Sequence, residues 1–248
     1  MRNLKFTVRY DGTEFYGWQT QPGFRTVQET IERAFAAITL ESRVKINGSG
    51  RTDSGVHALA QVFNVYTATE LAHEALVKAV NSKLPEDVKL LNCTAAGQAF
   101  DANRDAVGKR YRYAINDTRI PDPFLRRYAY QPRRVLNTDA MHGAAQAIRG
   151  RHDFRCFETE WPNRMTSIRT IQDIAVTRHD NQVYIEVQAD GFLYNMVRSI
   201  AGTLYHIGRG YWPVTRMHDV LIGMDRRLAG PTAPAQGLFM LWVKYGDD

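Results

Sequence analysis

The sequence predicts an α+β protein made of two halves, each with the element order β-α-β-β-α-β. Segments in which apolar and polar residues alternate, typical of half-buried strands, recur in both halves. Segments with apolar residues at helical spacing lie between them in the same order. With 248 residues, of which 44% are hydrophobic, the chain is long enough for one large domain or two small ones.

The first half shows this order most clearly. A half-buried strand is predicted over residues 4–10, and Thr26 with Glu29 predicts a capping box at the start of a helix. The further elements predicted in this half are strands over 44–48 and 60–66, a helix over 70–84 and a strand over 88–95.

The second half repeats the order with insertions, without a repeat in the sequence itself. Its predicted elements are a strand over 109–115, an extended segment over 128–131, a helix over 138–149 capped by Thr138, a hairpin of strands 168–177 and 183–189, a helix over 192–207 ended by Gly208, a helix over 215–223 and a strand over 238–245. We therefore expect an N-terminal subdomain over 1–104 and a C-terminal one over 105–248. Each would be ferredoxin-like, and their mainly antiparallel sheets would join around a central cleft.

The charge of the chain suits a polyanionic partner such as RNA or DNA. The net charge is +6, and between residues 104 and 134 nine Lys and Arg residues face only three acidic ones. Tyrosines alternate with these cations, at Tyr111, Tyr113, Tyr128 and Tyr130. Cations for phosphates and rings for bases are typical of nucleic-acid surfaces. A solvated strand face with tyrosines in the core is an equally good interpretation.

Several classes of protein and site are excluded by what the sequence lacks. It has no apolar stretch of membrane-spanning length and no signal-peptide core. Two cysteines, Cys93 and Cys156, predict reduced core thiols in a cytoplasmic protein. No metal-ligand spacing, phosphate-binding loop or dinucleotide motif occurs. We therefore expect neither a metal nor a cofactor, and chemistry by a carboxylate, a phenol or a histidine.

The stretch from residue 48 to 58 is the best candidate for a site. It holds three glycines, Arg51, a single carboxylate at Asp53, and His57, between two predicted strands. A lone carboxylate beside an arginine on a braced loop suits nucleophilic or acid–base catalysis. A tight turn in which Asp53 and Ser54 bond nearby backbone is the structural alternative.

This loop resembles the active-site motif of the tRNA pseudouridine synthase I family, the TruA type, and further blocks follow in the family's order along nearly the whole chain. The blocks are residues 50–58 (GRTDSGVHA), 10–19 (YDGTEFYGWQ), 26–29 (TVQE), 109–113 (KRYRY), 152–154 (HDF), 191–198 (GFLYNMVR) and 237–239 (GLF). The resemblance implies a pseudouridine synthase fold and a cytoplasmic homodimer that works without metal or cofactor. It further implies conversion of uridine to pseudouridine at positions 38, 39 and 40 of the tRNA anticodon stem-loop.

The resemblance also implies roles for individual residues. Asp53 would be the catalytic carboxylate, either as a nucleophile on the ring or sugar or as the base of a glycal route. Tyr111 would stack on the target base and is a candidate for taking the C5 proton, and Arg198 would be the ion partner of Asp53. Arg51 would assist flipping of the base, and Leu238 would wall it. A core tyrosine, a solvated helix charge and a core leucine are the structural alternatives for Tyr111, Arg198 and Leu238.

Contacts with the tRNA backbone are expected from the basic stretch and from the region of Arg164 and Arg169. The residues in the stretch are Lys109, Arg110, Arg112, Arg126 and Arg127. His57 is expected to bond backbone within its loop and is not expected to be catalytic.

Two other functions fit the same residues. One is an RNA-binding protein without catalysis, acting as a tRNA chaperone, in which Asp53→Asn would leave function intact. The other is a glycosylase that uses the carboxylate and releases free uracil.

Overall fold

The computed structural model describes residues 1–159 and 166–246. The chain divides into two compact units, unit 1 with Met1–Val107 and Met240–Asp248, and unit 2 with Gly108–Phe239. The last strand therefore groups mostly with the N-terminal residues, whereas the division at residue 104 assigned it to the second half.

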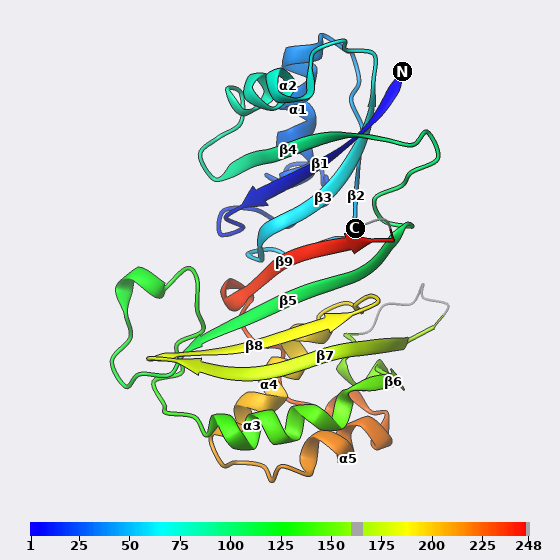
Figure 1. Cartoon of the computed structure of the whole chain (residues 1–248). Helices are drawn as coiled ribbons and strands as arrows, with labels where there is room; N and C mark the ends of the chain where they lie inside the picture. Colours follow the sequence, from blue (N-terminus) through cyan, green and yellow to red (C-terminus); the bar gives the residue numbers. More distant parts are fainter. Residues whose placement is uncertain (160–165, 247–248) are drawn as a thin grey trace. The chain divides into compact units, whose positions relative to one another are not determined.

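Unit 1 is a sheet with two helices on one face (Figure 1). Its strands lie in the order β4-β1-β3-β9, with β2 pairing β3, and the pairs β1–β3, β1–β4 and β2–β3 are antiparallel. The elements are β1 (Arg2–Tyr10), α1 (Val27–Thr39), β2 (Ile46–Gly48), β3 (His57–Thr67), α2 (His73–Asn81), β4 (Val88–Ala96) and the strand β9 (Leu238–Tyr245).

The alternation in the first strand produces the core of unit 1. Leu4, Phe6 and Val8 are fully buried, because successive side chains of a strand point to opposite faces. The ring of Phe6 stacks on Phe63 with centroids 5.2 Å apart, and Phe35 of α1 meets Phe6 edge-on at the same distance. Aromatic pairs in these geometries add to the apolar burial that joins helix and sheet.

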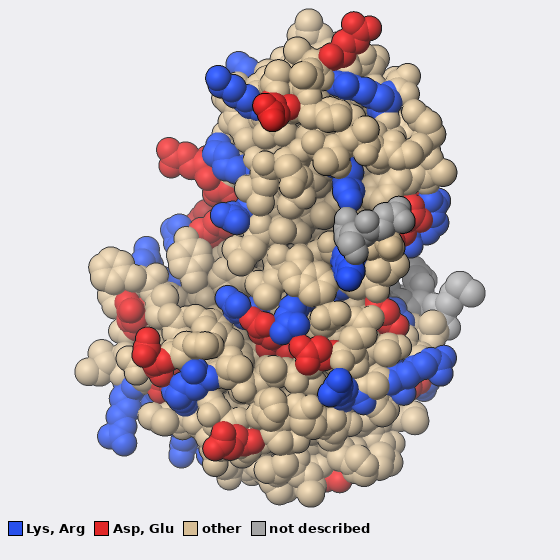
Figure 2. All heavy atoms as spheres, viewed as in Figure 1, with Lys and Arg blue, Asp and Glu red and all other residues tan. Residues whose placement is uncertain are grey.

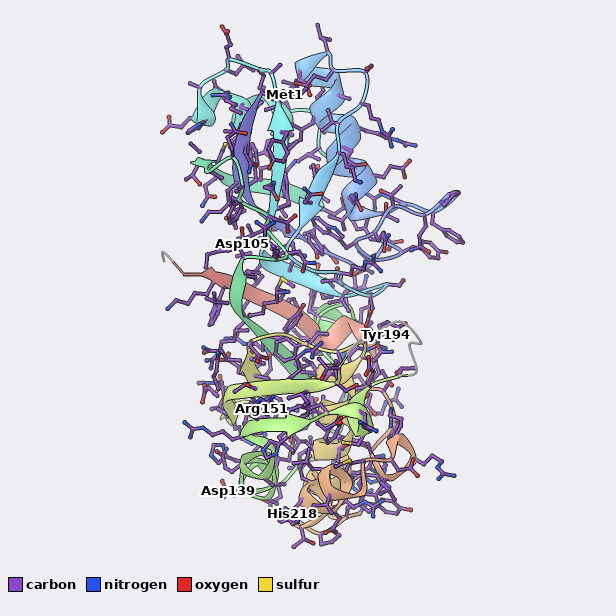
Figure 3. All side chains as sticks on the ribbon, turned by 90° about the vertical axis from the view of Figure 1, so that its right-hand side faces the viewer. Met1, Asp105, Asp139, Arg151, Tyr194 and His218 are labelled. Atoms are coloured by element: carbon purple, nitrogen blue, oxygen red, sulfur yellow. The ribbon has the colours of Figure 1, made fainter. Side chains whose placement is uncertain are left out.

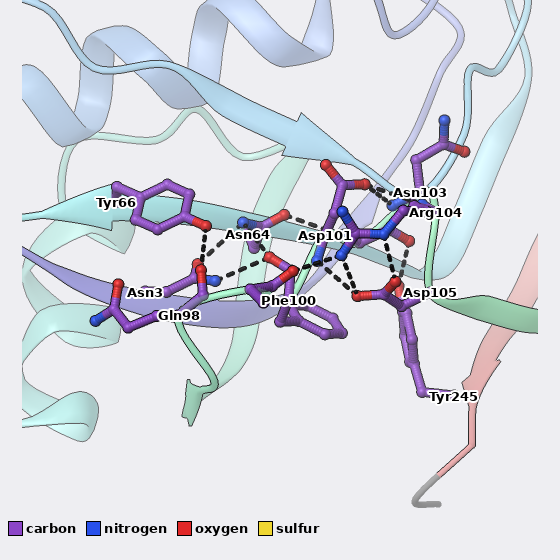
Figure 4. A network of polar contacts seen from close by, with 12 residues as sticks. Asn3, Asn64, Tyr66, Gln98, Phe100, Asp101, Asn103, Arg104, Asp105 and Tyr245 are labelled. Carbon is purple, nitrogen blue, oxygen red and sulfur yellow. Dashed lines mark hydrogen bonds and ion pairs between the residues drawn. The ribbon is translucent and has the colours of Figure 1, made fainter.

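The buried side-chain amides of Asn3 and Asn64 bind the segment that follows β4 to the sheet of unit 1 (Figure 4). The Asn64 side chain donates to Asn3 Oδ1 at 2.9 Å, and Asn3 donates to the carbonyls of Gly97 and Phe100, each at 2.9 Å. Asn64 Oδ1 accepts the Ala102 amide hydrogen at 3.0 Å. Because buried polar groups must be satisfied, this network fixes the course of the chain after β4.

Unit 2 has the same plan, with its helices gathered on one face of its sheet (Figure 1). The strand order is β5-β8-β7-β6, all antiparallel. Side chains fill the space between that sheet and the helices that carry Asp139 and His218 (Figure 3). The elements are β5 (Ala106–Asn116), which begins in unit 1, α3 (Thr138–Ala145), β6 (Gly150–Asp153), β7 (Ile168–His179), β8 (Gln182–Ala189), α4 (Met196–Gly208) and α5 (Arg216–Gly223).

The predicted α+β class with mainly antiparallel pairing is confirmed, whereas several local predictions are wrong. Thr26 makes no capping bond, and its buried hydroxyl has no hydrogen-bond partner among the described residues. The cap of α3 is Asn137, which accepts the Ala140 amide hydrogen, and not Thr138. The segment 128–131 forms only a bridge at Tyr130.

The helix predicted from residue 192 begins at Met196, because Asn195 takes a left-handed conformation with φ 60°. Gly208 is its last helical residue and not a left-handed cap. Strand β6 was not expected. None of the described helices is long and apolar enough to cross a membrane.

Candidate active site

The loop that carries Asp53 joins β2 to β3. Its main chain is hydrogen-bonded to the segment that follows β1. The Trp18 amide donates to Thr52 O at 3.0 Å, and the Gly55 amide donates to Phe15 O at 3.2 Å. The hydroxyls of Tyr10 and Thr52 share a hydrogen bond of 2.8 Å. The loop is therefore fixed on both sides of Asp53 by residues 10–18.

Two glycines of residues 10–18 allow this close approach. A Cβ on Gly12 would lie 1.9 Å from Val56 O, and one on Gly17 would lie 2.6 Å from Thr52 O. Gly17 also has φ +86°, a conformation that residues with a Cβ rarely adopt. Only glycine fits at either position.

The loop itself forms a turn. The Val56 amide donates to Asp53 O at 3.1 Å, and the Ser54 hydroxyl donates to Phe15 O at 3.2 Å. Asp53 is half-buried and Arg51 is exposed. The structural alternative of a turn and the catalytic interpretation are therefore compatible, since the turn is made by the main chain of Asp53.

His57 makes a contact that was not expected. It is 1% exposed, and its Nδ1 accepts the amide hydrogen of Gly12 at 3.0 Å. This bond leaves the loop, whereas a bond to backbone within the loop was expected. The Nδ1 atom also lies 3.1 Å from Asp11 Oδ1.

In unit 2, Tyr111 lies on β5 with 7% of its surface exposed. Its ring meets Phe192 edge-on, with centroids 5.0 Å apart. Leu238, the first residue of β9, is 6% exposed. Both residues are buried, as the core alternatives for them also require.

Arg198 lies in the first turn of α4 and is held by its guanidinium. Nε donates to Ala233 O at 2.7 Å and Nη1 donates to Asn195 Oδ1 at 2.9 Å. The neighbouring carbonyl, Pro234 O, accepts the hydroxyl hydrogen of Tyr113 at 2.8 Å. Arg198 is half-buried and its guanidinium is bonded within the protein, so it is not a fully solvated charge, and its role at Asp53 stays a prediction.

The family model described as tRNA pseudouridine synthase matches residues 7–103 and 144–246. A protein of Acetivibrio thermocellus named tRNA pseudouridine synthase A is 41% identical over 245 residues, covering 99% of this chain and all of the relative. The chain belongs to the tRNA pseudouridine synthase family.

Other relatives agree with this assignment. The tRNA pseudouridine synthase A 2 of Clostridium perfringens is 41% identical over 245 residues, with 99% of this chain and 100% of the relative covered. A solved H/ACA RNP bound to a substrate RNA containing 2′-deoxyuridine is 12% identical with a TM-score of 0.33, over 97% of this chain and 57% of that one. That likeness is too weak to support a conclusion.

The synthase is therefore an isomerase that forms pseudouridine in tRNA. Asp53, Arg198 and Leu238 lie inside the segments that the family model matches, while Tyr111 falls in the interval between residues 103 and 144. The sequence does not predict that residues 10–18 hold the loop of Asp53, although residues 10–19 form one of the blocks that resemble the family. Contacts between segments far apart in the sequence leave no local pattern. Tyr113 likewise has no predicted role of its own, although it is one of the alternating tyrosines and the last residue of the block 109–113.

Some of the basic residues of the synthase already pair with carboxylates of the same chain. Arg110 donates to Glu186 and Asp173, and Arg112 donates to Glu186 and lies over the Tyr184 ring. These pairs hold the pKa of Glu186 below its usual range despite its burial. Figure 2 shows Asp and Glu side chains among the Lys and Arg side chains of the visible face.

Two further cations of the synthase have distinct surroundings. Burial, and then the charge of Arg169, lower the pKa of Lys109 to about 8. Arg126 is exposed, and its Nη1 donates to Pro123 O in its own short turn at 2.9 Å. Arg164, one of the expected tRNA contacts, lies outside the described residues.

A cavity of about 520 Å³ lies in unit 2 between the start of α3 and the end of α4. Leu136, Ile207, Arg209 and Trp212 are among its lining residues, and none of the predicted site residues lines it. Among the described residues, no three His, Cys, Asp or Glu side chains are grouped so that they could hold a metal ion.

Proposed function

We propose that this synthase converts uridine to pseudouridine at positions 38, 39 and 40 of the anticodon stem-loop, as a cytoplasmic enzyme, with Asp53 as the catalytic carboxylate. The observation that carries the role of Asp53 is the loop around it. Its main chain is bonded to residues 10–18 on both sides, and two glycines are needed for that approach. Catalysis requires a reacting group in a fixed position, and such bracing provides it.

In the reaction, the bond between N1 of uracil and C1′ of the ribose breaks, the uracil turns, and C5 bonds to C1′. N1, which carries no proton in uridine, gains one, and C5 loses one. Asp53 acts either as the nucleophile on the ring or sugar, or as the base that starts a glycal route. Tyr111 stacks on the base and is the candidate acceptor of the C5 proton. Its burial against Phe192 supports a fixed ring plane.

Arg198 supplies the positive charge that keeps the Asp53 carboxylate ionised in a closed site. Its two bonds from Nε and Nη1, to Ala233 O and Asn195 Oδ1, support a fixed guanidinium. Arg51 occupies the stack that the flipped base leaves, which its exposure allows, and Leu238 walls the base. Extrusion of a base from a stem costs a few kcal/mol, so a residue that fills the gap assists it.

The tRNA backbone is contacted by Lys109, Arg110, Arg112, Arg126 and Arg127. Among them, the exposed Arg126 has no carboxylate bonded to it among the described contacts, whereas Arg110 and Arg112 share Glu186. Phosphate contacts by such side chains give affinity that is independent of sequence and sensitive to salt. Arg126 should therefore contribute more than Arg110.

The decisive experiment incubates the enzyme with unmodified tRNA and maps pseudouridine by carbodiimide-dependent stops in reverse transcription. Stops at positions 38–40 are expected with the wild type. Asp53→Asn should lower turnover by about 10³-fold or more, with tRNA binding largely kept. No stops at these positions with folded, tRNA-binding protein would overturn the target site. Turnover by Asp53→Asn near the wild-type rate would overturn the role of Asp53, and release of free uracil would indicate a glycosylase.

We further propose that the synthase acts as a homodimer. Ile120 and Phe124 are each 84% exposed and Val135 is 62% exposed, all in the segment between β5 and α3. Exposed apolar side chains gathered in one segment are typical of interfaces. Light scattering is expected to give twice the 28.3 kDa of one chain, falling toward one chain in Phe124→Asp. A wild-type mass of one chain at working concentration would contradict the proposal.

A further inference from the structure

His57 is a buried titratable group that the proposed reaction does not use. It is the first residue of β3, directly after the loop of Asp53. Beside it, the β1–β3 ladder is irregular, with Tyr10 opposite Ala58. The imidazole therefore lies where the chain leaves β1 and where it enters β3. This place lets one side chain join both segments.

Two groups compete for the Nδ1 atom of His57. The Gly12 amide hydrogen points at it from 3.0 Å, and Asp11 Oδ1 lies 3.1 Å away. Nδ1 carries either a lone pair or a proton, so it cannot accept from one and donate to the other. Asp11 Oδ1 already accepts two hydrogens from Thr13, from its amide at 3.0 Å and its hydroxyl at 2.6 Å. The Gly12 bond is thus the better assignment, with the imidazole neutral and its proton on Nε2.

The bond to Gly12 bears on the position of Asp53 through two further contacts. The Cα of Gly12 lies against the Val56 carbonyl so closely that a Cβ would come within 1.9 Å of its oxygen. The Val56 amide in turn donates to Asp53 O at 3.1 Å. A shift of Gly12 would therefore move Val56 and open the turn that sets the direction of the Asp53 side chain.

We propose that His57 is a positioning residue for Asp53, and that it acts by accepting the Gly12 amide hydrogen at Nδ1. This inference rests on the proposed role of Asp53. It assigns His57 no contact with the base and no proton transfer in the reaction. Its role is to keep residues 10–18 pressed against the loop while the substrate is exchanged.

Two substitutions separate this role from a merely structural one. In His57→Asn, the side-chain oxygen stands as many bonds from Cβ as Nδ1 does, so it can still accept the Gly12 hydrogen. In His57→Gln, the amide stands one bond further out, nearer the place of Nε2. Both variants remain polar and both lose the ring, so general loss of packing affects each of them.

We expect His57→Gln to lower kcat on the order of 10²-fold, because small misplacements of a catalytic group cost about that much. KM for tRNA should change less than twofold. His57→Asn should recover kcat to within about fivefold of the wild type at a temperature where both variants are folded. Equal loss of kcat in the two variants, or a loss that appears in KM alone, would overturn the positioning role.

Nitrogen NMR of the wild-type imidazole gives a second, independent measurement. The Nδ1 signal of His57, assigned by its disappearance in His57→Asn, should have the shift of an unprotonated acceptor at neutral pH. A protonated Nδ1 would show that the bond runs to Asp11 and would overturn the proposed mechanism. Neither measurement depends on the outcome for Asp53→Asn, which tests the proposed function separately.

Discussion

Asp53 in unit 1 and Arg198 in unit 2 are held in place in different ways, the first through the main chain of its loop and the second through its side chain. Around Asp53, bonds from Phe15 and Trp18 reach the main chain of Gly55 and Thr52, and Val56 of the loop itself donates to Asp53 O. Around Arg198, they reach the guanidinium itself, from Ala233 O and Asn195 Oδ1. The first residue is thus held through the main chain around it, and the second is held through its own guanidinium.

The two regions share one device, a glycine pressed against a carbonyl. A Cβ on Gly12 would lie 1.9 Å from Val56 O, and a Cβ on Gly202 of α4 would lie 1.8 Å from Pro231 O. The segment that follows Pro231 supplies the carbonyl that binds Arg198. In each unit, a contact that only glycine allows therefore involves the segment that bonds a proposed catalytic residue.

The largest effect is expected where this shared device is broken. Gly12→Ala should lower the free energy of unfolding by about 3 kcal/mol or more, because the new methyl group meets the main-chain carbonyl of Val56, directly before β3. Its turnover should fall as well. Gly97→Ala is the matched control in the same unit, since nothing lies within 4 Å of its added Cβ.

Thermal denaturation of the two alanine variants measures the difference. A shift of several degrees is expected for Gly12→Ala relative to Gly97→Ala, as about 3 kcal/mol implies for a protein of this size. Equal midpoints would mean that the close approach of Gly12 to Val56 does not exist in solution.

A smaller effect, confined to activity, is expected from Arg198→Lys. The ammonium keeps the charge but cannot place two hydrogens where Nε and Nη1 place theirs. We expect kcat to fall on the order of 10²-fold, with the thermal midpoint within a few degrees of the wild type. Single-turnover kinetics with saturating enzyme measures this loss without interference from tRNA release.

The control for Arg198→Lys is Arg227→Lys. Arg227 is 90% exposed and pairs with Asp225, so its replacement should leave turnover unchanged. Near-normal turnover by Arg198→Lys would remove the distinction drawn between the two regions, because side-chain geometry would then not matter at Arg198.

The sequence predicts elements best where one face of a strand or helix is buried. The alternation in residues 4–10 gives β1, and β9 has the bounds predicted for it. Strand β6, with the sequence GRHD, has no alternation to detect and forms through its pairing with β7. The late start of α4 comes from the left-handed Asn195, which apolar spacing does not reveal.

Site residues were predictable to a different degree. The roles proposed for Asp53 and Arg198 rest on resemblance, since a glycine-rich loop or a helical arginine alone is usually structural. The bracing of the loop by Tyr10, Phe15 and Trp18 spans about 40 residues of sequence. Such contacts depend on how β1 and β3 pair, so only the folded chain shows them.

The contacts between residues 10–18 and the loop also bear on how the protein opens. Amide hydrogens exchange with solvent when the cooperative unit that contains them unfolds, and surface loops usually exchange early. The amides of Trp18 and Gly55 are bonded across the two segments, and Gly12 lies against Val56 O. The loop of Asp53 should thus exchange with the slow strands of unit 1, so the geometry on which its proposed role depends lasts for as long as that sheet stays folded.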